Sequence, residues 1–231
     1  MNDITVIIPC YNEGINLHKL IDKINPIIKL NQNIFFIIVN NGSTDNTSEI
    51  LRNIFINKDK IKIINIKENK GYGHGIMHGV KKVSTEFIAW THADLQTDIG
   101  DIVKGYKKIL LLKDNKKKII KGKRRKNTFL NDFFTRSMSI FASKYLNLRL
   151  DDINGQPKIF NRSIISEMKN PPTDFCLDLY LLYVGLKNGY EIHEFNVFFK
   201  KRYKGNSKGG GTIIGKIKLS FKTIKYIIKL K

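Results

Sequence analysis

The chain has 231 residues, 42% of them hydrophobic, which is enough for one large domain or for a domain with a small extension. No apolar run approaches the roughly 20 residues that a membrane-spanning helix needs. The formal net charge is +21, and residues 200–231 contain no acidic residue. This end of the chain would attract phosphates, an anionic membrane surface or nucleic acid, unless it is only a solvated basic face.

Two features bear on where the protein works. Cys10 and Cys176 are isolated thiols, which fits a reducing cytoplasm better than a disulfide-bonded scaffold. Met1 is followed almost directly by an apolar run, which is not the pattern of a signal peptide. We therefore expect a cytoplasmic protein, and the basic C-terminal end allows a peripheral position on the inner face of the cell membrane.

The first hundred residues alternate between apolar runs of strand length and helical patterns. The runs are residues 5–9, 34–39, 61–66 and 87–91. Asn16 is a candidate N-cap of the first helix, and Pro26 should kink or end it. Because the runs are continuously apolar, they favour a parallel sheet covered on both faces. The pattern predicts a doubly wound α/β fold, with ligands at the carboxyl ends of the strands.

The second half is less regular. Helical patterns cover residues 102–110, 129–148, 177–186 and 213–230, and shorter segments include a charged turn at 113–118, a short strand at 119–120, a loop and strand at 151–162, one or two strands at 191–203 and a glycine-rich loop at 205–211. The last helix carries lysines between apolar residues. It could lie on a membrane surface, or it could pack its isoleucine face on the core.

The residues after the fourth strand suggest a metal site. Asp94 and Gln96 are two positions apart, so in an extended segment their oxygen atoms point to the same side. One carboxylate and one amide oxygen suit a hard divalent cation that keeps coordination positions open for phosphates. The alternative is a capped turn before a helix that Asp98 could start.

Four motifs occur in a fixed order, each at the end of a predicted strand. They are residues 8–13, 41–47, 69–75 and 93–96. Together they resemble the nucleotide-sugar-binding half of the family-2 glycosyltransferases with a GT-A fold, and most of all the branch of dolichol-phosphate mannose synthases and bacterial polyprenyl-phosphate sugar transferases. The resemblance extends over roughly the whole chain and is strongest over its first hundred residues.

The resemblance implies a GT-A-like, doubly wound and mostly parallel central sheet with helices on both faces, followed by a C-terminal amphipathic helix. One glycosyltransferase domain would cover residues 1–205, with a nucleotide-sugar-binding half at 1–98 and an acceptor half at 99–205. Residues 206–231 would form the glycine-rich loop and the basic helix.

The resemblance also assigns the donor site. The nucleotide sugar would contact Pro9, Tyr11, Asn12, Glu13, Asn40, Asp45, Gly71, Gly73, His74, Gly75, His92, Ala93 and Asp94. Asp94 and Gln96 would hold Mg²⁺ or Mn²⁺ against the diphosphate. Asp45 could instead be a helix N-cap, and Pro9 could merely end its strand. The chain departs from the family at His92, which replaces the first aspartate of the D-x-D motif, and at Asn40-Asn41, which replaces an acidic pair.

Phosphate contacts are expected from the second half. Arg124, Arg136, Lys158, Arg202 and Lys208 are the candidates. Arg202 and Lys208 match the R-x-x-G-x-S-K stretch of the lipid-phosphate branch, whereas Gln156-Pro157-Lys158 replaces the last residues of its D-x-x-S-G-F-R segment. For Arg124 and Arg136 a surface basic patch is the alternative.

Asp178 is the remaining catalytic candidate besides Asp94. It stands among apolar residues on a predicted helix, where an unpaired carboxylate would be costly. It is therefore either a general base for an acceptor hydroxyl or half of a buried ion pair. A phosphate acceptor is already ionised and would need no base.

The resemblance implies an enzyme that moves a sugar from a nucleoside diphosphate sugar, with UDP or GDP as the nucleotide, to a polyprenyl-phosphate or lipid-linked acceptor, with inversion. One alternative is a glycosyltransferase of cell-surface polysaccharide synthesis that uses a sugar hydroxyl as acceptor. Another is a non-catalytic binding or scaffold subunit, which His92 and Asn40 motivate. No strand carries interleaved aromatic and basic residues, so we expect no nucleic-acid partner.

Overall fold

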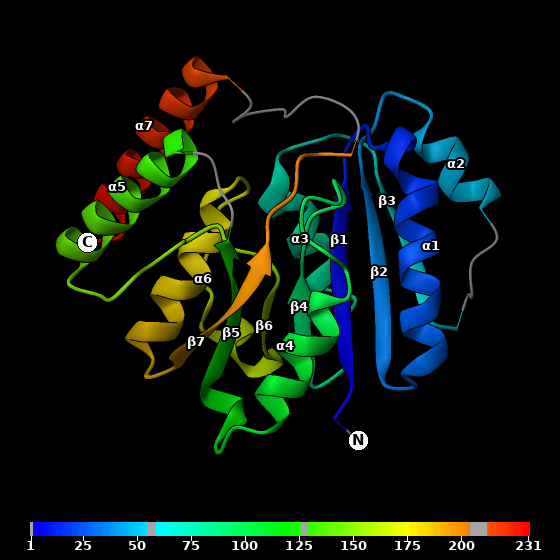
Figure 1. Ribbon diagram of the computed structural model, residues 1–231, viewed down its shortest axis with the longest axis horizontal. Helices are drawn as coiled ribbons and strands as arrows, with labels where there is room; N and C mark the ends of the chain where they lie inside the picture. Colours follow the sequence, from blue (N-terminus) through cyan, green and yellow to red (C-terminus); the bar gives the residue numbers. More distant parts are fainter. Residues whose placement is uncertain (1, 55–58, 126–128, 204–211) are drawn as a thin grey trace.

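The computed structural model describes residues 2–54, 59–125, 129–203 and 212–231, and these are arranged around one seven-stranded sheet (Figure 1). The strands, in chain order, are β1 (Ile4–Cys10), β2 (Ile34–Asn41), β3 (Ile61–Ile66), β4 (Phe87–Trp90), β5 (Lys118–Arg125), β6 (Lys158–Asn161) and β7 (Glu191–Phe198). They lie in the order β3-β2-β1-β4-β6-β5-β7. Strands from both predicted halves of the chain therefore join the same sheet.

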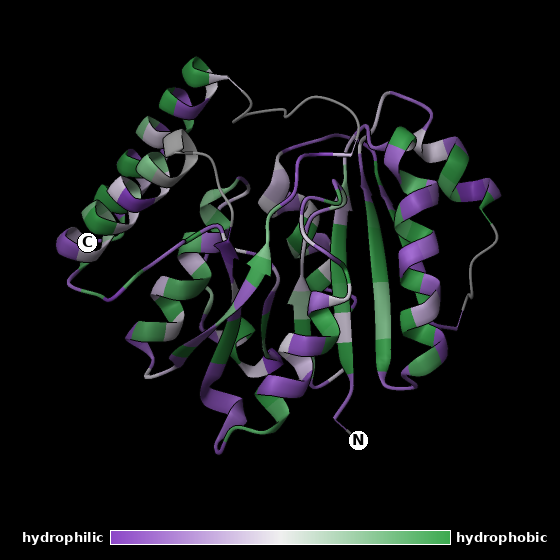
Figure 2. Ribbon diagram, in the orientation of Figure 1, coloured by the Kyte–Doolittle hydropathy of each residue, from purple (hydrophilic) through white to green (hydrophobic). Residues whose placement is uncertain are grey.

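The sheet is mostly parallel. β1 pairs in parallel with β2 and β4, β2 with β3, and β5 with β7, whereas β6 runs antiparallel to both β4 and β5. The first four strands are apolar and buried, as parallel strands covered on both faces should be. Figure 2 shows β1 and β2 hydrophobic along most of their length. The prediction of an α/β fold with a mostly parallel sheet is confirmed.

Helices cover both faces of the sheet. They are α1 (Gly14–Leu30), α2 (Thr47–Asn53), α3 (Tyr72–Val80), α4 (Asp101–Leu110), α5 (Phe129–Leu146), α6 (Cys176–Lys187) and α7 (Ile213–Lys229), with short 3₁₀ segments η1 (Asn115–Lys117) and η2 (Arg162–Glu167). Alternate residues of β1 point to opposite faces. Ile4, Val6 and Ile8 belong to the core shared with α1 and α4, and Ile7 to the core shared with α3 and α6.

Several local predictions need correction. α1 begins at Gly14, before the expected cap Asn16, and it continues past Pro26 to Leu30, so Pro26 does not end it. The strand expected at residues 119–120 is β5, eight residues long. It is longer because β7 pairs with it from Lys118 to Arg125, and this pairing includes the basic residues that follow the predicted strand.

The last helix fits neither of its two predicted placements alone. α7 packs beside α5 (Figure 1). Near its C-terminal end, Ile227 is buried and the Tyr183 hydroxyl of α6 donates to the Leu230 carbonyl at 2.7 Å. Its first half instead exposes large apolar side chains, including Ile214 at 67% and Phe221 at 63%. The predicted glycine-rich loop at 205–211 lies outside the described residues.

Candidate functional site

A cleft of about 590 Å³ opens at the carboxyl edge of β1, β2 and β4, the upper edge of these strands in Figure 1. Its volume is in the usual range for a small-molecule site. Eleven of the predicted site residues line it: Pro9, Tyr11, Glu13, Gly71, His92, Ala93, Asp94, Gln96, Arg124, Asp178 and Arg202. The sheet thus brings residues from positions 9 to 202 into one cavity, as the rule for carboxyl ends of parallel strands predicts.

Asn12 and Asp45 are predicted donor contacts, but in the structure they join the loop after β1 to the loop after β2. Asn12 has a φ of 53°, its Nδ2 donates to Thr44 Oγ1 at 3.1 Å, and its Oδ1 accepts from the Thr44 backbone N–H at 2.7 Å. Asp45 accepts from the N–H of Thr47, the first residue of α2, at 3.0 Å. Asp45 also accepts from the Gly14 N–H at 3.3 Å, and the N-cap of α2 is Asn46, so Asp45 is not the N-cap that its alternative predicted. Neither Asn12 nor Asp45 is among the residues that line the cleft.

β2 ends in two asparagines, and the one that lines the cleft is Asn41, not the predicted Asn40. Asn40 is buried, and its Nδ2 donates to Ser48 Oγ at 2.6 Å and to Asn65 Oδ1 at 3.0 Å. Asn41 lines the cleft and donates to the Gly71 carbonyl at 2.9 Å. Consecutive strand residues face opposite sides, so only one of the pair can face the ligand. The sequence did not reveal which, because the strand runs two residues further than predicted.

The glycine run packs mainly against protein. Gly71 has a φ of 115° and lines the cleft, but a Cβ there would lie 2.4 Å from a backbone oxygen of the 172–174 segment, and a Cβ at Gly73 only 2.3 Å from another. Gly73, His74 and Gly75 lie in α3, and none of them is among the cleft-lining residues. The His74 N–H donates to the 172–174 segment at 2.8 Å, and burial lowers the pKa of its imidazole. Of the three glycines predicted to contact the nucleotide sugar, Gly71 and Gly73 therefore lie closest to the backbone of residues 172–174.

Tyr72, which was not among the predicted site residues, lines the cleft and contacts several of its other residues. Its ring is stacked on Phe175 at 4.9 Å between centroids, and it lies 5.1 Å from the His92 ring. Its hydroxyl accepts a hydrogen bond from Gln156 Nε2 at 3.2 Å. Its place among three glycines of a predicted loop gave no signal of this role, because its partners come from distant segments.

Asp94 forms an ion-pair cluster with Arg202 and Glu13. Asp94 is 8% exposed, and its Oδ2 accepts from Arg202 Nη2 at 3.0 Å. Arg202 Nη1 donates to Glu13 Oε1, also at 3.0 Å. The Asp94 and Arg202 segments run together, because the Lys200 N–H donates to the Gln96 carbonyl at 2.8 Å and the Gln96 amide donates to the Lys200 carbonyl at 3.2 Å. One guanidinium thus pairs with two cleft carboxylates.

The donor set at Asp94 fits a hard divalent cation that takes most of its ligands from a phosphate substrate. Among the described residues there is no group of three His, Cys, Asp or Glu side chains that could hold a metal ion. Mg²⁺ is often bound by one or two carboxylates together with substrate phosphates and waters, so three protein carboxylates are not required. Leu95, between Asp94 and Gln96, has a φ of 59°, so the segment is not extended as expected, and Asp94 Oδ1 accepts from the Gln96 N–H at 3.1 Å. Asp94 can supply a carboxylate oxygen once Arg202 releases Oδ2, and Gln96 can supply an amide oxygen, since its amide nitrogen is the end that donates to Lys200.

Asp178 is half of a buried ion pair, the second of its two predicted alternatives. Its side chain is 1% exposed and lies 3.1 Å from Lys158 Nζ. It also accepts from Trp90 Nε1 at 2.8 Å and from Gln156 Nε2 at 3.0 and 3.1 Å. Both carboxylate oxygens of Asp178 thus already accept hydrogen bonds from the protein.

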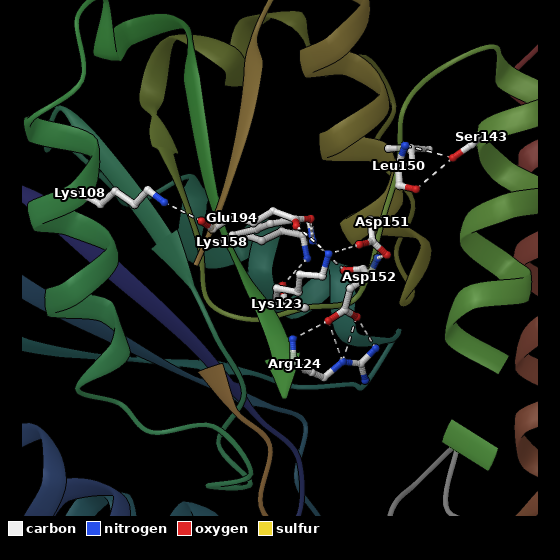
Figure 3. Close-up of polar contacts among 11 residues, drawn as sticks. Lys108, Lys123, Arg124, Ser143, Leu150, Asp151, Asp152, Lys158 and Glu194 are labelled. Atoms are coloured by element: carbon white, nitrogen blue, oxygen red, sulfur yellow. Dashed lines mark hydrogen bonds and ion pairs between the residues drawn. The ribbon is translucent and has the colours of Figure 1, made fainter. Parts of the chain in front are cut away.

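The predicted phosphate ligands have different surroundings. Lys158 is fully buried, so its ammonium faces Asp178 rather than the cleft, and burial lowers its pKa to about 8. Arg124 lines the cleft while Asp152 accepts from its Nε at 2.9 Å (Figure 3). Arg136 is exposed on α5 and is not among the lining residues. Lys208 lies outside the described residues.

α7 contributes two cleft residues that the sequence did not single out for this role. Lys216 and Leu219 line the cavity together with Phe199 and Phe175. They add a basic and apolar wall opposite in character to the carboxylates of Asp94 and Glu13. The amphipathic pattern of residues 213–230 predicted the helix, but nothing in it indicated that one side would reach the cleft.

Comparison with known proteins agrees with this geometry. The chain matches the model of the family described as "Glycosyl transferase family 2" over residues 5–168. It is 27% identical over 172 residues to the protein named "Putative glycosyltransferase CsbB" of Bacillus subtilis, covering 71% of this chain and 50% of that protein. It is 32% identical over 127 residues to a dolichyl-phosphate beta-glucosyltransferase of Trichomonas vaginalis, covering 52% of this chain and 38% of that protein. The chain thus spans half or less of the length of these relatives.

Solved structures share the fold. Glucosyl-3-phosphoglycerate synthase from Mycobacterium tuberculosis, crystallised with Mn²⁺, UDP and glucosyl-3-phosphoglycerate, superposes with a TM-score of 0.72 at 16% identity, covering 99% of this chain and 79% of that one. The mannosyltransferase PcManGT from Pyrobaculum calidifontis, crystallised with GDP-Man and Mn²⁺, gives a TM-score of 0.63 at 19% identity, covering 87% and 58%. The GT-A-like architecture expected from the four motifs is confirmed.

Proposed function

Because the chain belongs to glycosyl transferase family 2, we propose that it transfers a sugar from a nucleoside diphosphate sugar to a phosphate carried by a polyprenyl or similar lipid, at the cytoplasmic face of the cell membrane. The observation that carries this proposal is the composition of the cleft. One cavity joins the Asp94, Glu13 and Arg202 cluster to a basic and apolar wall that includes Lys216 and Leu219.

The donor would occupy the part of the cleft formed by the loops after β1, β2 and β4. Pro9, Tyr11 and Glu13 line it, as the family resemblance expects of a base and ribose site, and Asn41 replaces the predicted Asn40. UDP and GDP are the candidate nucleotides, since proteins of the same fold have been crystallised with UDP and with GDP-Man. Asn41 in place of an acidic side chain would alter how the base is recognised.

The diphosphate would lie at Asp94. Asp94 and Gln96 would hold a Mg²⁺ or Mn²⁺ ion, which as a Lewis acid would stabilise the negative charge of the leaving nucleoside diphosphate. Arg202 already faces Asp94, and its planar guanidinium suits bidentate contact with a phosphate. Binding of donor and cation would therefore exchange Asp94 for phosphate oxygens at Arg202, while Glu13 keeps its contact with the guanidinium.

The state of the cleft carboxylates supports a phosphate acceptor. Within the described part of the chain, each cleft carboxylate has a cationic partner: Glu13 and Asp94 pair with Arg202, and Asp178 pairs with Lys158. A sugar hydroxyl would need one of them as a general base, whereas a phosphate oxygen is ionised at neutral pH and can attack the anomeric carbon directly. The new C–O bond would form as the bond to the diphosphate breaks, which inverts the configuration. Arg124 and Lys216 could bind the acceptor phosphate.

A lipid acceptor would explain the exposed face of α7. Within the described residues, no helix is both long enough and apolar enough to span a membrane. α7 exposes Ile213, Ile214, Ile217 and Phe221 beside lysines, which is the pattern of a helix that lies in an anionic membrane interface. The same helix lines the cleft, so it would bring the membrane surface next to the site of transfer.

Two experiments test the proposal in sequence. A thermal-shift panel of UDP-, GDP- and dTDP-sugars, with and without Mn²⁺, identifies the donor, since binding to the folded state raises the melting temperature. The donor found is then incubated with the protein and vesicles that contain polyprenyl phosphate. We expect metal-dependent formation of the lipid-linked sugar and no product on vesicles that carry the free polyprenol. Transfer to the polyprenol alone would contradict a phosphate acceptor.

A second candidate function is a binding subunit without turnover. His92 at the first D-x-D position and the Arg202 guanidinium on Asp94 favour it, because both reduce the negative charge available to a metal. It predicts that a nucleotide sugar binds but is neither transferred nor hydrolysed. Metal-dependent release of nucleoside diphosphate by the wild type, and not by Asp94→Ala, would exclude this reading.

A further inference from the structure

Gln156, which lines the cleft, carries a side-chain oxygen atom that has no hydrogen-bond partner among the described residues. The residue is 1% exposed and lines the cavity. Its Nε2 makes hydrogen bonds, but its Oε1 is buried and has no partner among the described residues. A buried amide oxygen without a partner costs free energy, and native structures rarely retain one without a reason.

The neighbours of Gln156 determine which way its amide points. Nε2 donates to both oxygens of Asp178, at 3.0 and 3.1 Å, and to the Tyr72 hydroxyl at 3.2 Å. The reverse orientation would place Oε1 against a carboxylate that can only accept, so it is excluded by charge. Asp178 in turn is fixed by Trp90 and Lys158. The oxygen is thus presented by a rigid set of buried contacts.

Tyr72 adds a donor beside this acceptor. Since its hydroxyl oxygen accepts from Gln156, its proton can be given to another oxygen. Burial and the charges of Asp178 and Asp94 raise the pKa of Tyr72, so it keeps that proton at neutral pH. An amide oxygen next to a hydroxyl proton complements a sugar hydroxyl, which both donates and accepts.

The position of this pair indicates which sugar it would contact. Tyr72 lies beside His92, which is two residues before Asp94 in the chain. The transferred sugar is attached to the phosphate that the Asp94 cluster would hold, so it must lie close to that cluster. Its hydroxyls are then the nearest donors to Gln156, whereas the nucleotide lies on the other side of the diphosphate.

We propose that Gln156 and Tyr72 recognise a hydroxyl of the transferred sugar, and that Asp178 is the positioning residue that holds the Gln156 amide in the required orientation. This inference rests on the proposed function, since it needs a sugar-nucleotide donor. It assigns Asp178 a part in sugar selection in place of proton transfer.

The test compares binding of a nucleotide with and without its sugar. Calorimetry with Mn²⁺ is carried out for UDP, UDP-glucose, GDP and GDP-mannose on the wild type, Gln156→Met and Tyr72→Phe, with Gln32→Met as a control for the same substitution at an exposed position. We expect each cleft variant to bind the sugar nucleotide about three- to tenfold more weakly, as the loss of one hydrogen bond predicts, while affinity for the bare nucleotide changes less than about twofold.

Deoxy-sugar donors extend the comparison. A donor that lacks the recognised hydroxyl should bind the wild type more weakly but Gln156→Met no more weakly than the parent donor does. Asp178→Asn should reduce the same discrimination, because an asparagine no longer fixes the orientation of the Gln156 amide. Tyr72→Phe keeps the ring and its stacking on Phe175, so it gives an answer even if Gln156→Met does not fold.

The outcomes separate the two proposals. If the wild type binds a sugar nucleotide and the variants weaken bare nucleotide and sugar nucleotide equally, or weaken neither, the role of Gln156 is wrong and the proposed function stands. If the wild type binds no nucleotide and no sugar nucleotide, both are wrong.

Discussion

The two aspartates of the cleft have the same charge and the same kind of partner, but their surroundings give them opposite roles. Asp94 shares Arg202 with Glu13, and that arginine comes from the segment after β7 and is partly exposed. Asp178 is enclosed by Trp90, Gln156 and Lys158. Arg202 can leave Asp94 for a phosphate while a cation takes its place at the carboxylate, whereas the partners of Asp178 cannot leave without exposing a buried charge. We expect Asp94 to act on the ligand and Asp178 to act on the protein.

The largest expected effect is on stability, from Asp178→Ala. Removing one member of a buried ion pair leaves Lys158 uncompensated, which typically costs about 3–5 kcal/mol. Chemical denaturation monitored by circular dichroism should show a loss of this size in the free energy of unfolding. The double variant Asp178→Leu with Lys158→Met should recover most of the loss, because it removes both charges. A single variant as stable as the wild type would contradict the buried-pair assignment.

Asp94→Ala should leave stability almost unchanged and reduce sugar transfer about a hundredfold or more, by the loss of charge stabilisation at the leaving group. Stability should hold because Arg202 keeps Glu13 as a partner. Initial rates at saturating donor, with Mn²⁺ varied, measure the effect. The different roles of the two aspartates would be contradicted if Asp94→Ala unfolded the protein. They would also be contradicted if Asp178→Ala kept the stability of the wild type but lost activity.

The sequence predicts part of the contrast between Asp94 and Asp178. The apolar runs of β1 and β4 and the polar residues near their ends, such as Asp94, could be predicted, because they are local patterns in the sequence. The ion-pair alternative for Asp178 was readable too, since a carboxylate within an apolar helix needs a partner. The identity of that partner was not, because β4 and β6 pair antiparallel and bring Lys158 and Trp90 together from 68 positions apart.

The wrong assignments have the same cause, which is that contacts between distant segments decide where these side chains lie. Lys158 was assigned to phosphate because it stands at the end of the segment that matches the family's D-x-x-S-G-F-R, but it begins strand β6 and is fully buried. Asn40 was chosen over Asn41 because the end of β2 could not be placed to one residue. Tyr72 lies in the cleft through contacts with distant segments, such as its hydrogen bond with Gln156, and Lys216 lies there through the packing of α7 beside α5. No local pattern encodes such contacts.

The pH dependence of the free energy of unfolding tests the buried pair of Asp178 and Lys158. The pKa of Lys158 falls to about 8, chiefly through burial, against the favourable charge of Asp178 and with Lys121 and Asp152 nearby. Between pH 8 and about 10, Lys158 is neutral in the folded state and protonated in the unfolded chain, so unfolding takes up a proton and the free energy of unfolding rises with pH. Relative to Lys158→Met, the wild type should gain stability with a slope approaching about 1.4 kcal/mol per pH unit. A flat difference would show that the buried lysine stays charged.

The smallest expected effect is the change in metal affinity caused by Arg202→Gln. It is also the sharpest test of whether Arg202 can be exchanged at Asp94. Arg202 competes with a cation for Asp94 Oδ2, so its removal should strengthen binding of Mn²⁺ alone by about three- to tenfold, the range expected for one charge-assisted contact. In the presence of nucleoside diphosphate the sign should reverse, because the arginine then contacts the phosphates. Electron paramagnetic resonance of free Mn²⁺ measures both affinities, and Arg125→Gln, whose side chain bonds Asn196 at the exposed end of β5, is the matched control. Weaker Mn²⁺ binding by Arg202→Gln in the absence of nucleotide would mean that the arginine supports the metal site instead of competing for it, and Asp94 would then be as fixed as Asp178.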